Sequence, residues 1–332
     1  KAEDRVPQAR IYKVWNIPGW GTMCADNLDL VSSILSDGKT SRLYKRLVYD
    51  DQLATSVSAY INTREIAGLF TIQADARPGV ELSKVEKAID EELAKFLADG
   101  PTAKELERVK AQFAARFVRG VERIGGFGGK SDILASSMVN GGSPDAYKTT
   151  LKHIEDATPE ALKGSANYWL ADGVYILEVT PYPQYTAAKE GADRKSMPAA
   201  GVPPQAQFPA LQRATLANGL KIVLAERHAI PVVNFGLVID AGYAADKSAI
   251  LGTSSLAMSM LDEGTAKRTS LEISDELAML GATLGAGSDL DTSLVSLSTL
   301  KDKLDPALDI YADVILNPAF PEADFKRLQN IQ

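Results

Sequence analysis

The second half of this chain repeats the order of elements that the first half shows. Residues 84–110 align with residues 303–329 without a gap. Both segments have the pattern of a helix, a break with proline and a second helix. The segment Ile34–Gly38 aligns with Met260–Gly264 in the same way. A helix and two strands are expected between these landmarks in each half. The shared order predicts a duplicated α+β unit, with an antiparallel sheet packed against helices in each copy.

The length of the chain and one proline-rich stretch divide it into domains. At 332 residues it is too long for one ordinary compact core. We expect a first domain at residues 1–183 and a second at residues 212–332. Residues 184–211 are expected to be a linker, because Pro181–Pro209 is rich in proline and in small or charged residues without periodicity.

Charge and residue counts exclude several classes of site. The net charge of −7 argues against a nucleic-acid-binding surface, which needs basic residues to neutralise phosphates. A single cysteine excludes an intrachain disulfide and a cysteine-rich zinc site. The two histidines, His153 and His228, lie in different predicted domains, so a histidine-rich metal site is excluded as well. The sequence has no apolar run of about 18 residues, so no membrane-spanning helix is expected.

A glycine-rich segment, Gly125–Lys130 (GGFGGK), invites comparison with a phosphate-binding loop. The first glycine of that motif would stand at position 124, which is Ile124, and no strand precedes it. We therefore interpret the segment as a helix junction or a loop that lines a substrate site, with Gly128 and Gly129 as candidate contact residues. An unrelated enzyme with a glycine-loop site is the alternative, and it predicts nucleotide binding.

The segment Gly252–Thr265 (GTSSLAMSMLDEGT) has the spacing of a metal-binding helix without its ligands. In the inverted zinc motif His-x-x-Glu-His, the two histidines share one helix face and the glutamate polarises the metal-bound water. The corresponding positions are Ser255, Met258 and Ser259. Because a hydroxyl is a poor zinc ligand and a thioether cannot act as a base, we expect no metal ligand and no catalytic residue here.

Other polar residues are expected to have structural roles. Asp262 and Glu263 point to different sides of a helix end, so they are expected to be solvated charges rather than an acid/base pair. His153 lies at a helix end, where a cation complements the helix dipole. An exposed edge strand at Val232–Val238 is expected to contact an extended peptide through backbone hydrogen bonds.

Several short motifs follow one another in the second half: LANGLK at 216–221, DAG at 240–242, the segment Gly252–Thr265, LGA at 280–282, and Asn317-Pro318 with Phe320. In this order they resemble the amino-terminal domain of the M16 zinc peptidases of the insulinase and pitrilysin type. Residues 1–183 resemble the domain that follows a metal-binding domain in the same family. The resemblance implies duplicated domains of the mitochondrial-processing-peptidase type.

The resemblance also implies two halves that enclose a chamber for unfolded peptide, with zinc bound by one half. Because Ser255, Met258 and Ser259 replace the ligands and the base, residues from about 212 onward would belong to the inactive half. The third zinc ligand of the family, a glutamate, would fall at or just beyond Gln332. The chain would then be an internal, non-catalytic fragment of a bacterial zinc metalloendopeptidase, with no cofactor in this span and zinc in the parent protein.

The resemblance finally places one contact residue and suggests partners. Tyr147 stands where some members carry a substrate-contacting tyrosine, whereas the arginine that accompanies it there is replaced near Asn140. The implied partners are an unfolded peptide or protein and the catalytic M16 half, in the same chain or in a partner chain. The alternative is a wholly non-catalytic M16-derived scaffold or assembly subunit. A periplasmic location is favoured, and a cytoplasmic one stays open.

Overall fold

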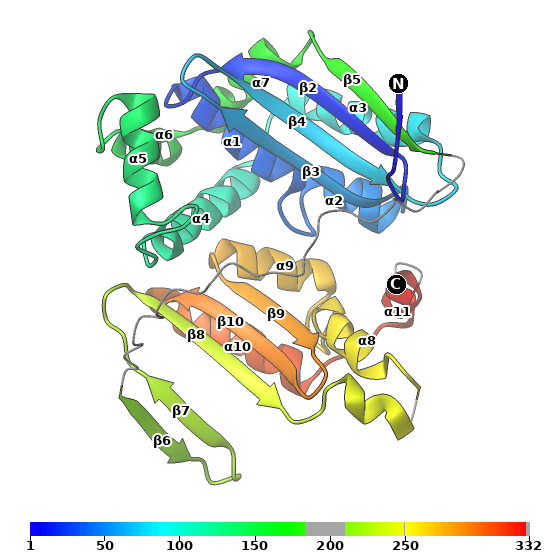
Figure 1. Ribbon diagram of the computed structural model, residues 1–332, viewed down its shortest axis with the longest axis vertical. Helices are drawn as coiled ribbons and strands as arrows, with labels where there is room; N and C mark the ends of the chain where they lie inside the picture. The colour runs from blue at the N-terminus through cyan, green and yellow to red at the C-terminus, as the bar shows by residue number, and fades with distance from the viewer. Residues whose placement is uncertain (183–209, 249, 330–332) are drawn as a thin grey trace, which may run out of the picture.

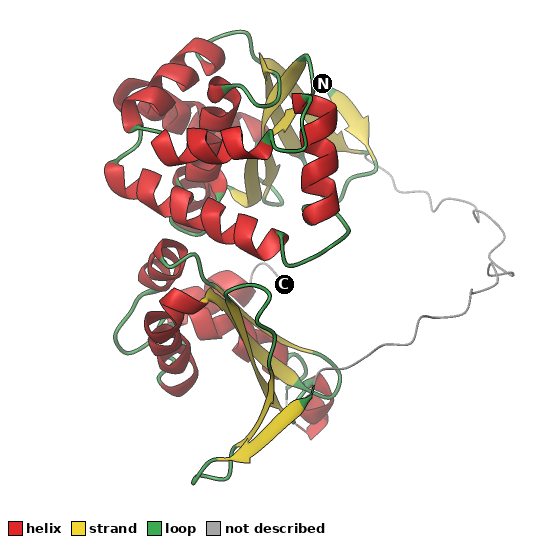
Figure 2. Cartoon of the chain, turned by 90° about the vertical axis from the view of Figure 1, so that its left-hand side faces the viewer, coloured by secondary structure: helices red, strands yellow, loops and turns green. Residues whose placement is uncertain are grey.

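The protein folds into two units, each with its own sheet and its own apolar core (Figure 1). The computed structural model describes residues 1–182, 210–248 and 250–329. We call residues 1–182 the N-terminal unit and the described residues from 210 onward the C-terminal unit. Figure 2 shows that helices of the two units face one another, and α4 packs against α9 there. Most of the predicted linker, residues 184–211, lies outside the described residues, and Leu211 already begins a strand.

The sheet of the N-terminal unit has five strands in the order β1-β5-β2-β4-β3. The strand β5 pairs antiparallel with β2 and parallel with β1, while β2, β4 and β3 are antiparallel neighbours. In β2 the inward positions Ile11, Trp15 and Ile17 are buried, which gives the alternation expected of a half-buried strand. The strands are β1 (Ala2–Asp4), β2 (Arg10–Pro18), β3 (Ala54–Thr63), β4 (Ala67–Ala76) and β5 (Tyr175–Pro181).

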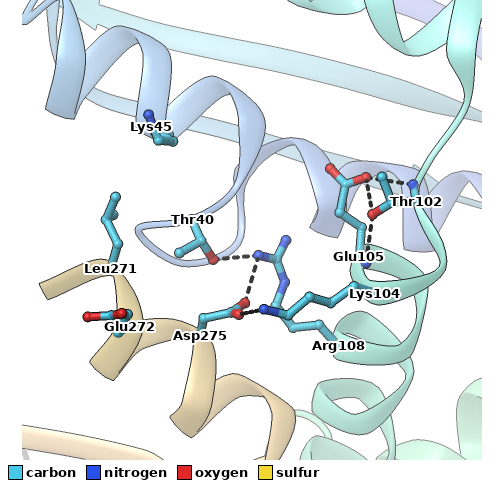
Figure 3. Close-up of a pocket in the computed structure, with 9 residues that line it drawn as sticks. All are labelled: Thr40, Lys45, Thr102, Lys104, Glu105, Arg108, Leu271, Glu272 and Asp275. Atoms are coloured by element: carbon cyan, nitrogen blue, oxygen red, sulfur yellow. Dashed lines mark hydrogen bonds and ion pairs between the residues drawn. The ribbon is translucent and has the colours of Figure 1, made fainter. Parts of the chain in front are cut away.

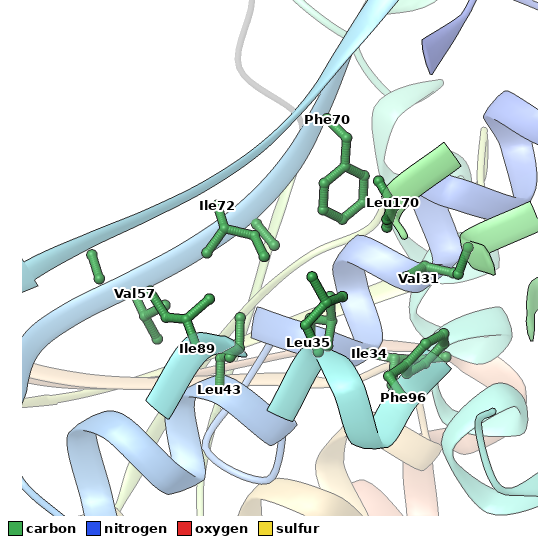
Figure 4. Close-up of a cluster of buried hydrophobic side chains, with 14 of the residues drawn as sticks. Val31, Ile34, Leu35, Leu43, Val57, Phe70, Ile72, Ile89, Phe96 and Leu170 are labelled. Atoms are coloured by element: carbon green, nitrogen blue, oxygen red, sulfur yellow. The ribbon is translucent and has the colours of Figure 1, made fainter. Parts of the chain in front are cut away.

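Helices supply the rest of the N-terminal core. Phe70 and Ile72 of β4 are fully buried with Leu35 of α1 and Phe96 of α3 (Figure 4). The predicted capping box at Thr102 and Glu105 is confirmed, because it opens α4 with both reciprocal hydrogen bonds. The helices are α1 (Met23–Ser36), α2 (Arg42–Tyr44) with a π-helical turn at Lys45–Asp50, α3 (Leu82–Asp99), α4 (Ala103–Gly120), α5 (Lys130–Gly141), α6 (Tyr147–Asp156) and α7 (Pro159–Leu170).

The C-terminal unit contains a three-stranded antiparallel sheet in the order β8-β10-β9. Val295 and Leu297 of β10 pack with Ile273, Ile310 and Val314 in its core. The hairpin of β6 (Leu211–Thr215) and β7 (Lys221–Ala225) forms a separate two-stranded sheet. The other elements are β8 (Val232–Ile239), α8 (Thr253–Met260), α9 (Ser270–Met279), β9 (Thr283–Ser288), β10 (Ser293–Leu300), α10 (Leu304–Leu316) and α11 (Glu322–Gln329).

The two units share an order of elements. Each contains a strand, two helical segments, a hairpin and a helix pair with a break, and the sheet order β2-β4-β3 corresponds to β8-β10-β9. The predicted helix at Leu304–Leu316 and the predicted helix start at Glu322 are confirmed. The α+β class expected from the sequence is therefore the class observed. None of the helices in the described ranges combines the length and the apolar character that crossing a membrane requires.

Candidate functional site

The glycine-rich loop is folded tightly against the start of α5. Gly129 is the N-cap residue of α5 and is buried, and a Cβ atom there would lie 2.5 Å from the carbonyl oxygen of Gly125. Gly128 has a φ of +72° and donates its backbone N–H to Oδ2 of Asp132 at 2.7 Å. Gly128 itself is exposed. The loop therefore exposes Gly128 beside Asp132, whereas Gly129, the second predicted contact residue, is buried.

An apolar pocket lies next to this loop and includes Tyr147. The ring of Tyr147, the first residue of α6, stacks on Phe117 of α4 with 5.8 Å between centroids. Asp132, which holds Gly128, is at the edge of the same pocket. The pocket has a volume of about 210 Å³ and is lined by Trp20, Phe113, Phe117, Asp132, Ile133, Ser136, Ser137, Tyr147, Thr150 and Leu151. We call it the Tyr147 pocket, and it brings the predicted residue Tyr147 close to the glycine loop.

Asn140, near the position of the arginine that the resemblance implies, has a local partner. Its side-chain amide donates to the carbonyl oxygen of Ser136 at 3.1 Å, within α5. It therefore supports its own helix and contributes no positive charge to the Tyr147 pocket. The polar side-chain groups of its lining residues are hydroxyls, the indole N–H of Trp20 and the carboxylate of Asp132.

A buried carboxylate fixes α6, which carries Tyr147, against α1. His153 Nδ1 lies 2.6 Å from Oδ2 of Asp26, and the hydroxyl of Thr150 donates to the other oxygen at 3.4 Å. Burial raises the pKa of Asp26, and its contacts with His153 act in the opposite direction. The sequence placed His153 at a helix end but gave no sign of this partner, which lies 127 residues away. This contact holds one wall of the Tyr147 pocket.

A second carboxylate of α1 gives a test of the pH dependence of folding. Burial raises the pKa of Asp29 to about 6, against the attraction of Arg116. A carboxyl with a raised pKa in the folded state favours folding at pH below about 4, and this contribution is lost as pH rises through about 6. We expect Asp29→Asn to raise the free energy of unfolding by about 1–3 kcal/mol at pH 7.5 and to change it little at pH 4. Urea unfolding at the two pH values measures this, and an equal effect at both would contradict it.

A buried ionic cluster joins the two units. Glu263, which follows α8, is 4% exposed and accepts hydrogen bonds from Lys39 Nζ at 3.0 Å and Arg327 Nη2 at 2.6 Å. Ser270 donates to the same carboxylate at 3.0 Å. The guanidinium of Arg327 in turn lies over the ring of Tyr49, 5.3 Å from its centroid. The prediction that Glu263 is a solvated charge is therefore wrong, because two distant cations and a hydroxyl enclose it.

A second contact between the units surrounds Asp275 of α9 (Figure 3). Lys104 Nζ lies 2.5 Å from one carboxylate oxygen, and the buried Arg108 approaches the other at 3.7 Å while donating to the hydroxyl of Thr40. Within the part of the chain that the structure describes, Nε and Nη2 of Arg108 have no acceptor. The pocket here has a volume of about 310 Å³ and three acidic side chains among its lining residues, Glu105, Glu272 and Asp275. Because these carboxylates would repel an anion, we interpret the pocket as part of a contact between the units rather than as an anion site.

The helix α8 places the three positions of the zinc motif in different surroundings. Ser255 is half-buried, and Ser259 is exposed and donates its hydroxyl to the carbonyl oxygen of Ser255 at 3.0 Å. Met258 is 7% exposed and belongs to the apolar core of the C-terminal unit. Across residues 1–182, 210–248 and 250–329, no three histidine, cysteine, aspartate or glutamate side chains form a group that could hold a metal ion.

Comparison with protein families accounts for both units. Residues 1–113 match the family described as the peptidase M16 inactive domain. Residues 221–332 match Insulinase (peptidase family M16), so the two matches cover more than half of the chain between them. The chain belongs to the M16 peptidase family.

Curated relatives of this M16 chain are longer than the chain itself. It is 29% identical over 141 residues to the beta subunit of mitochondrial-processing peptidase from Rattus norvegicus, covering 42% of this chain and 29% of the relative. It is 30% identical over 115 residues to the alpha subunit from Solanum tuberosum, covering 35% and 23%. It is 26% identical over 121 residues to the uncharacterized zinc protease YmxG of Bacillus subtilis, covering 36% and 30%. The chain spans less than a third of the length of these relatives.

The solved structures that this chain matches include two bacterial proteases. A protease from Helicobacter pylori has a TM-score of 0.49 at 20% identity, covering 54% of this chain and 43% of that one. The periplasmic protease PqqL from Escherichia coli has a TM-score of 0.42 at 15% identity, covering 99% of this chain and 41% of that one.

The residues of α8 do not fit the zinc ion that the M16 family implies. Zinc in proteins is bound by imidazole nitrogen, thiolate sulfur or carboxylate oxygen. At the three motif positions this M16 chain has two hydroxyls and a thioether, and the thioether of Met258 is packed in an apolar core. The hydroxyl of Ser259 is also directed to its own helix. The side chains of α8 therefore support no metal-dependent step.

Proposed function

We propose that this chain is a non-catalytic portion of an M16 zinc metalloendopeptidase and that it forms part of a chamber wall that contacts peptide substrate. The observation that carries the proposal is the Tyr147 pocket, where apolar side chains meet a few polar groups beside the glycine loop. The side chains of α8 at the three motif positions support a non-catalytic role, because they offer neither a zinc ligand nor a base.

The size and lining of the Tyr147 pocket favour one side chain of an extended peptide as its occupant. At about 210 Å³ it is smaller than pockets that enclose a whole drug-sized ligand, which measure roughly 300–1,000 Å³. Trp20, Phe113 and Phe117 offer aromatic faces to an apolar or aromatic group. The exposed Gly128 and the carboxylate of Asp132 lie beside it, where they would meet peptide backbone. A pocket for one side chain fits a protein that accepts many peptide sequences.

Peptide binding by the whole chain tests this proposal. We expect a fluorescent, unstructured peptide with one phenylalanine to bind, and Tyr147→Ala to weaken its affinity about tenfold through the loss of one aromatic contact. Anisotropy titration measures the dissociation constant. The matched control is Tyr168→Ala, since Tyr168 is 78% exposed and does not line the pocket. Equal affinities of all three proteins would rule out the Tyr147 pocket as a peptide site.

The remaining parts of the proposal concern the longer protein. We propose that zinc is bound there by a catalytic M16 half, in the same chain or in a partner chain. The curated relatives include proteins named as alpha and beta subunits, which supports an assembly of unlike parts. We propose that the longer protein is bacterial and is located in the periplasm. If the anisotropy titration shows no peptide binding at all, the scaffold or assembly subunit becomes the better assignment.

We also propose that the two units arose by duplication of one α+β domain. The shared order of elements and the corresponding sheet orders β2-β4-β3 and β8-β10-β9 support this proposal. The proposed domains are residues 1–183 and 212–332, joined by a linker at residues 184–211.

A further inference from the structure

The Tyr147 pocket combines several aromatic rings with one carboxylate. Phe113 and Phe117 come from α4, and Tyr147 comes from α6. The helix α5 lies beside α6 and supplies Asp132 (Figure 1). Trp20, which precedes α1, is a fourth aromatic residue of the lining. Among the described residues that line the pocket, none is a lysine, an arginine or a histidine. The lining therefore has a negative formal charge in aromatic surroundings.

The carboxylate of Asp132 has one oxygen without a partner among the described residues. Its Oδ2 accepts the backbone N–H of Gly128 at 2.7 Å, whereas Oδ1 accepts no hydrogen bond in residues 1–182, 210–248 and 250–329. The side chain is half-buried at the edge of the pocket. Salt and water screen a partly buried charge less than an exposed one, so Asp132 attracts a cation in the pocket more strongly than a surface carboxylate would.

The ring of Tyr147 already has a cation near it. Nζ of Lys148 lies 6.0 Å from the centroid of this ring. Lys148 does not line the pocket, and its ammonium group also pairs with Asp145 at 2.8 Å. The face of an aromatic ring is negative and attracts cations within about 6 Å. A cation that enters the pocket from solution would be attracted to its rings in the same way.

The polar groups of the pocket can accept hydrogen bonds from a cation. Asp132 only accepts when it is ionised, and the hydroxyls of Ser136, Ser137 and Thr150 accept as well as donate. A ligand group with several N–H donors and a flat face would match both the acceptors and the aromatic rings. The guanidinium of arginine has both properties, whereas the ammonium of lysine has donors without a flat face.

We infer that the Tyr147 pocket selects an arginine side chain of the bound peptide over a neutral side chain of the same shape. The inference rests on the proposed peptide-binding function and names its substrate class, unstructured peptides that carry arginine. The guanidinium stacks on an aromatic ring and donates to Oδ1 of Asp132. A phenylalanine side chain also enters the pocket through aromatic contacts, but it gains nothing from the charge of Asp132. The net charge of −7 further favours a basic peptide.

Peptides that differ at one position test the inference with the whole chain. A fluorescent, unstructured peptide carries arginine, citrulline or phenylalanine at this position, and citrulline has the shape of arginine without its charge. We expect the arginine peptide to bind about tenfold more tightly than the citrulline peptide, because it adds a cation–π contact and a charge-assisted hydrogen bond. Anisotropy titration measures each dissociation constant.

Asp132→Asn tests the role of the carboxylate. We expect the preference for arginine over citrulline to fall to about threefold or less, because only the cation–π contact remains. The asparagine carbonyl can keep the hydrogen bond from Gly128, so affinity for the phenylalanine peptide should stay within about twofold and show that the pocket is intact. Asp156→Asn is the matched control, since Asp156 ends α6, is 65% exposed and does not line the pocket. This variant should keep the full preference.

Three results would overturn the inference: equal affinities for the arginine and citrulline peptides, a preference that Asp132→Asn leaves unchanged, and an equal loss of preference in Asp132→Asn and Asp156→Asn. If Tyr147→Ala still weakens the binding of every peptide in such a case, the proposed peptide site stands and only its selectivity for arginine is wrong. If Tyr147→Ala changes none of the affinities, the pocket is not a peptide site and both proposals fail.

Discussion

Glu263→Ala is expected to lower the free energy of unfolding by about 3–5 kcal/mol, the loss typical of removing one partner from a buried ionic cluster. The substitution leaves Lys39 and Arg327 without their shared carboxylate at a site where Glu263 is only 4% exposed. Burial opposes the ionisation of Glu263, but the two cations outweigh it and hold its pKa below the ordinary value. Stability from this cluster is therefore present at neutral pH and is lost as pH falls through that lowered pKa.

Urea unfolding of the whole chain measures the effect at neutral pH, and the neighbouring residue supplies the matched control. Asp262 also contacts Lys39, at 2.9 Å, but its side chain is 38% exposed. Asp262→Asn is expected to cost no more than about 1 kcal/mol, because partly exposed ion pairs contribute little. If Glu263→Ala cost as little as Asp262→Asn, the cluster would not be a main contact between the units.

Gly281→Ala is expected to separate α9 from α4 and to cost about 2–4 kcal/mol. Gly281 has a φ of +59°, a conformation that costs other residues about 1–2 kcal/mol. A Cβ atom there would also lie 2.6 Å from Cβ of Ala115 and 3.1 Å from the carbonyl oxygen of Ala111. The clash adds an overpacking cost to the backbone strain. The carbonyl of Gly281 also accepts a hydrogen bond from Arg119, so a shift at this point disturbs a second contact between the units.

A double-mutant cycle with Ala115→Gly separates the clash from the backbone strain. If the two side chains collide, the double variant should be more stable than the sum of the two single effects by about 1–2 kcal/mol. Gly219→Ala provides the control for strain alone, because Gly219 has a φ of +88° and no atom within 4 Å of a Cβ atom there. Strictly additive effects of Gly281→Ala and Ala115→Gly would show that this close approach does not hold the units together.

Local sequence patterns predicted the elements of the fold well. The capping box at Thr102 and Glu105 and the helix at Leu304–Leu316 depend on residues that are close in sequence, and both are observed. Patterns of residues that are close in sequence could not predict the stacking of Tyr147 on Phe117 or the pairing of His153 with Asp26. These partners come from different helices, so only the tertiary arrangement brings them together.

The misinterpretation of Glu263 has the same physical origin. Two adjacent carboxylates at a helix end are normally solvated, because charged side chains are rarely buried unless they are paired. The partners that allow its burial, Lys39 and Arg327, are 224 and 64 residues away. Lys39 follows Gly38 in the segment that aligns with the segment ending at Gly264. That alignment predicted similar architecture and gave no indication of contact.

Hydrolysis of quenched fluorescent peptides by residues 1–332, with and without added zinc, tests most directly the proposal that this M16 chain has no metal-dependent activity of its own. We expect no zinc-dependent cleavage, and no change in the variant that combines Ser255→Ala and Ser259→Ala. We also expect the chain to bind the phenylalanine peptide through the Tyr147 pocket. Cleavage that requires zinc and disappears in the Ser255→Ala, Ser259→Ala variant would show that α8 takes part in a metal-dependent reaction and would contradict the proposed non-catalytic role.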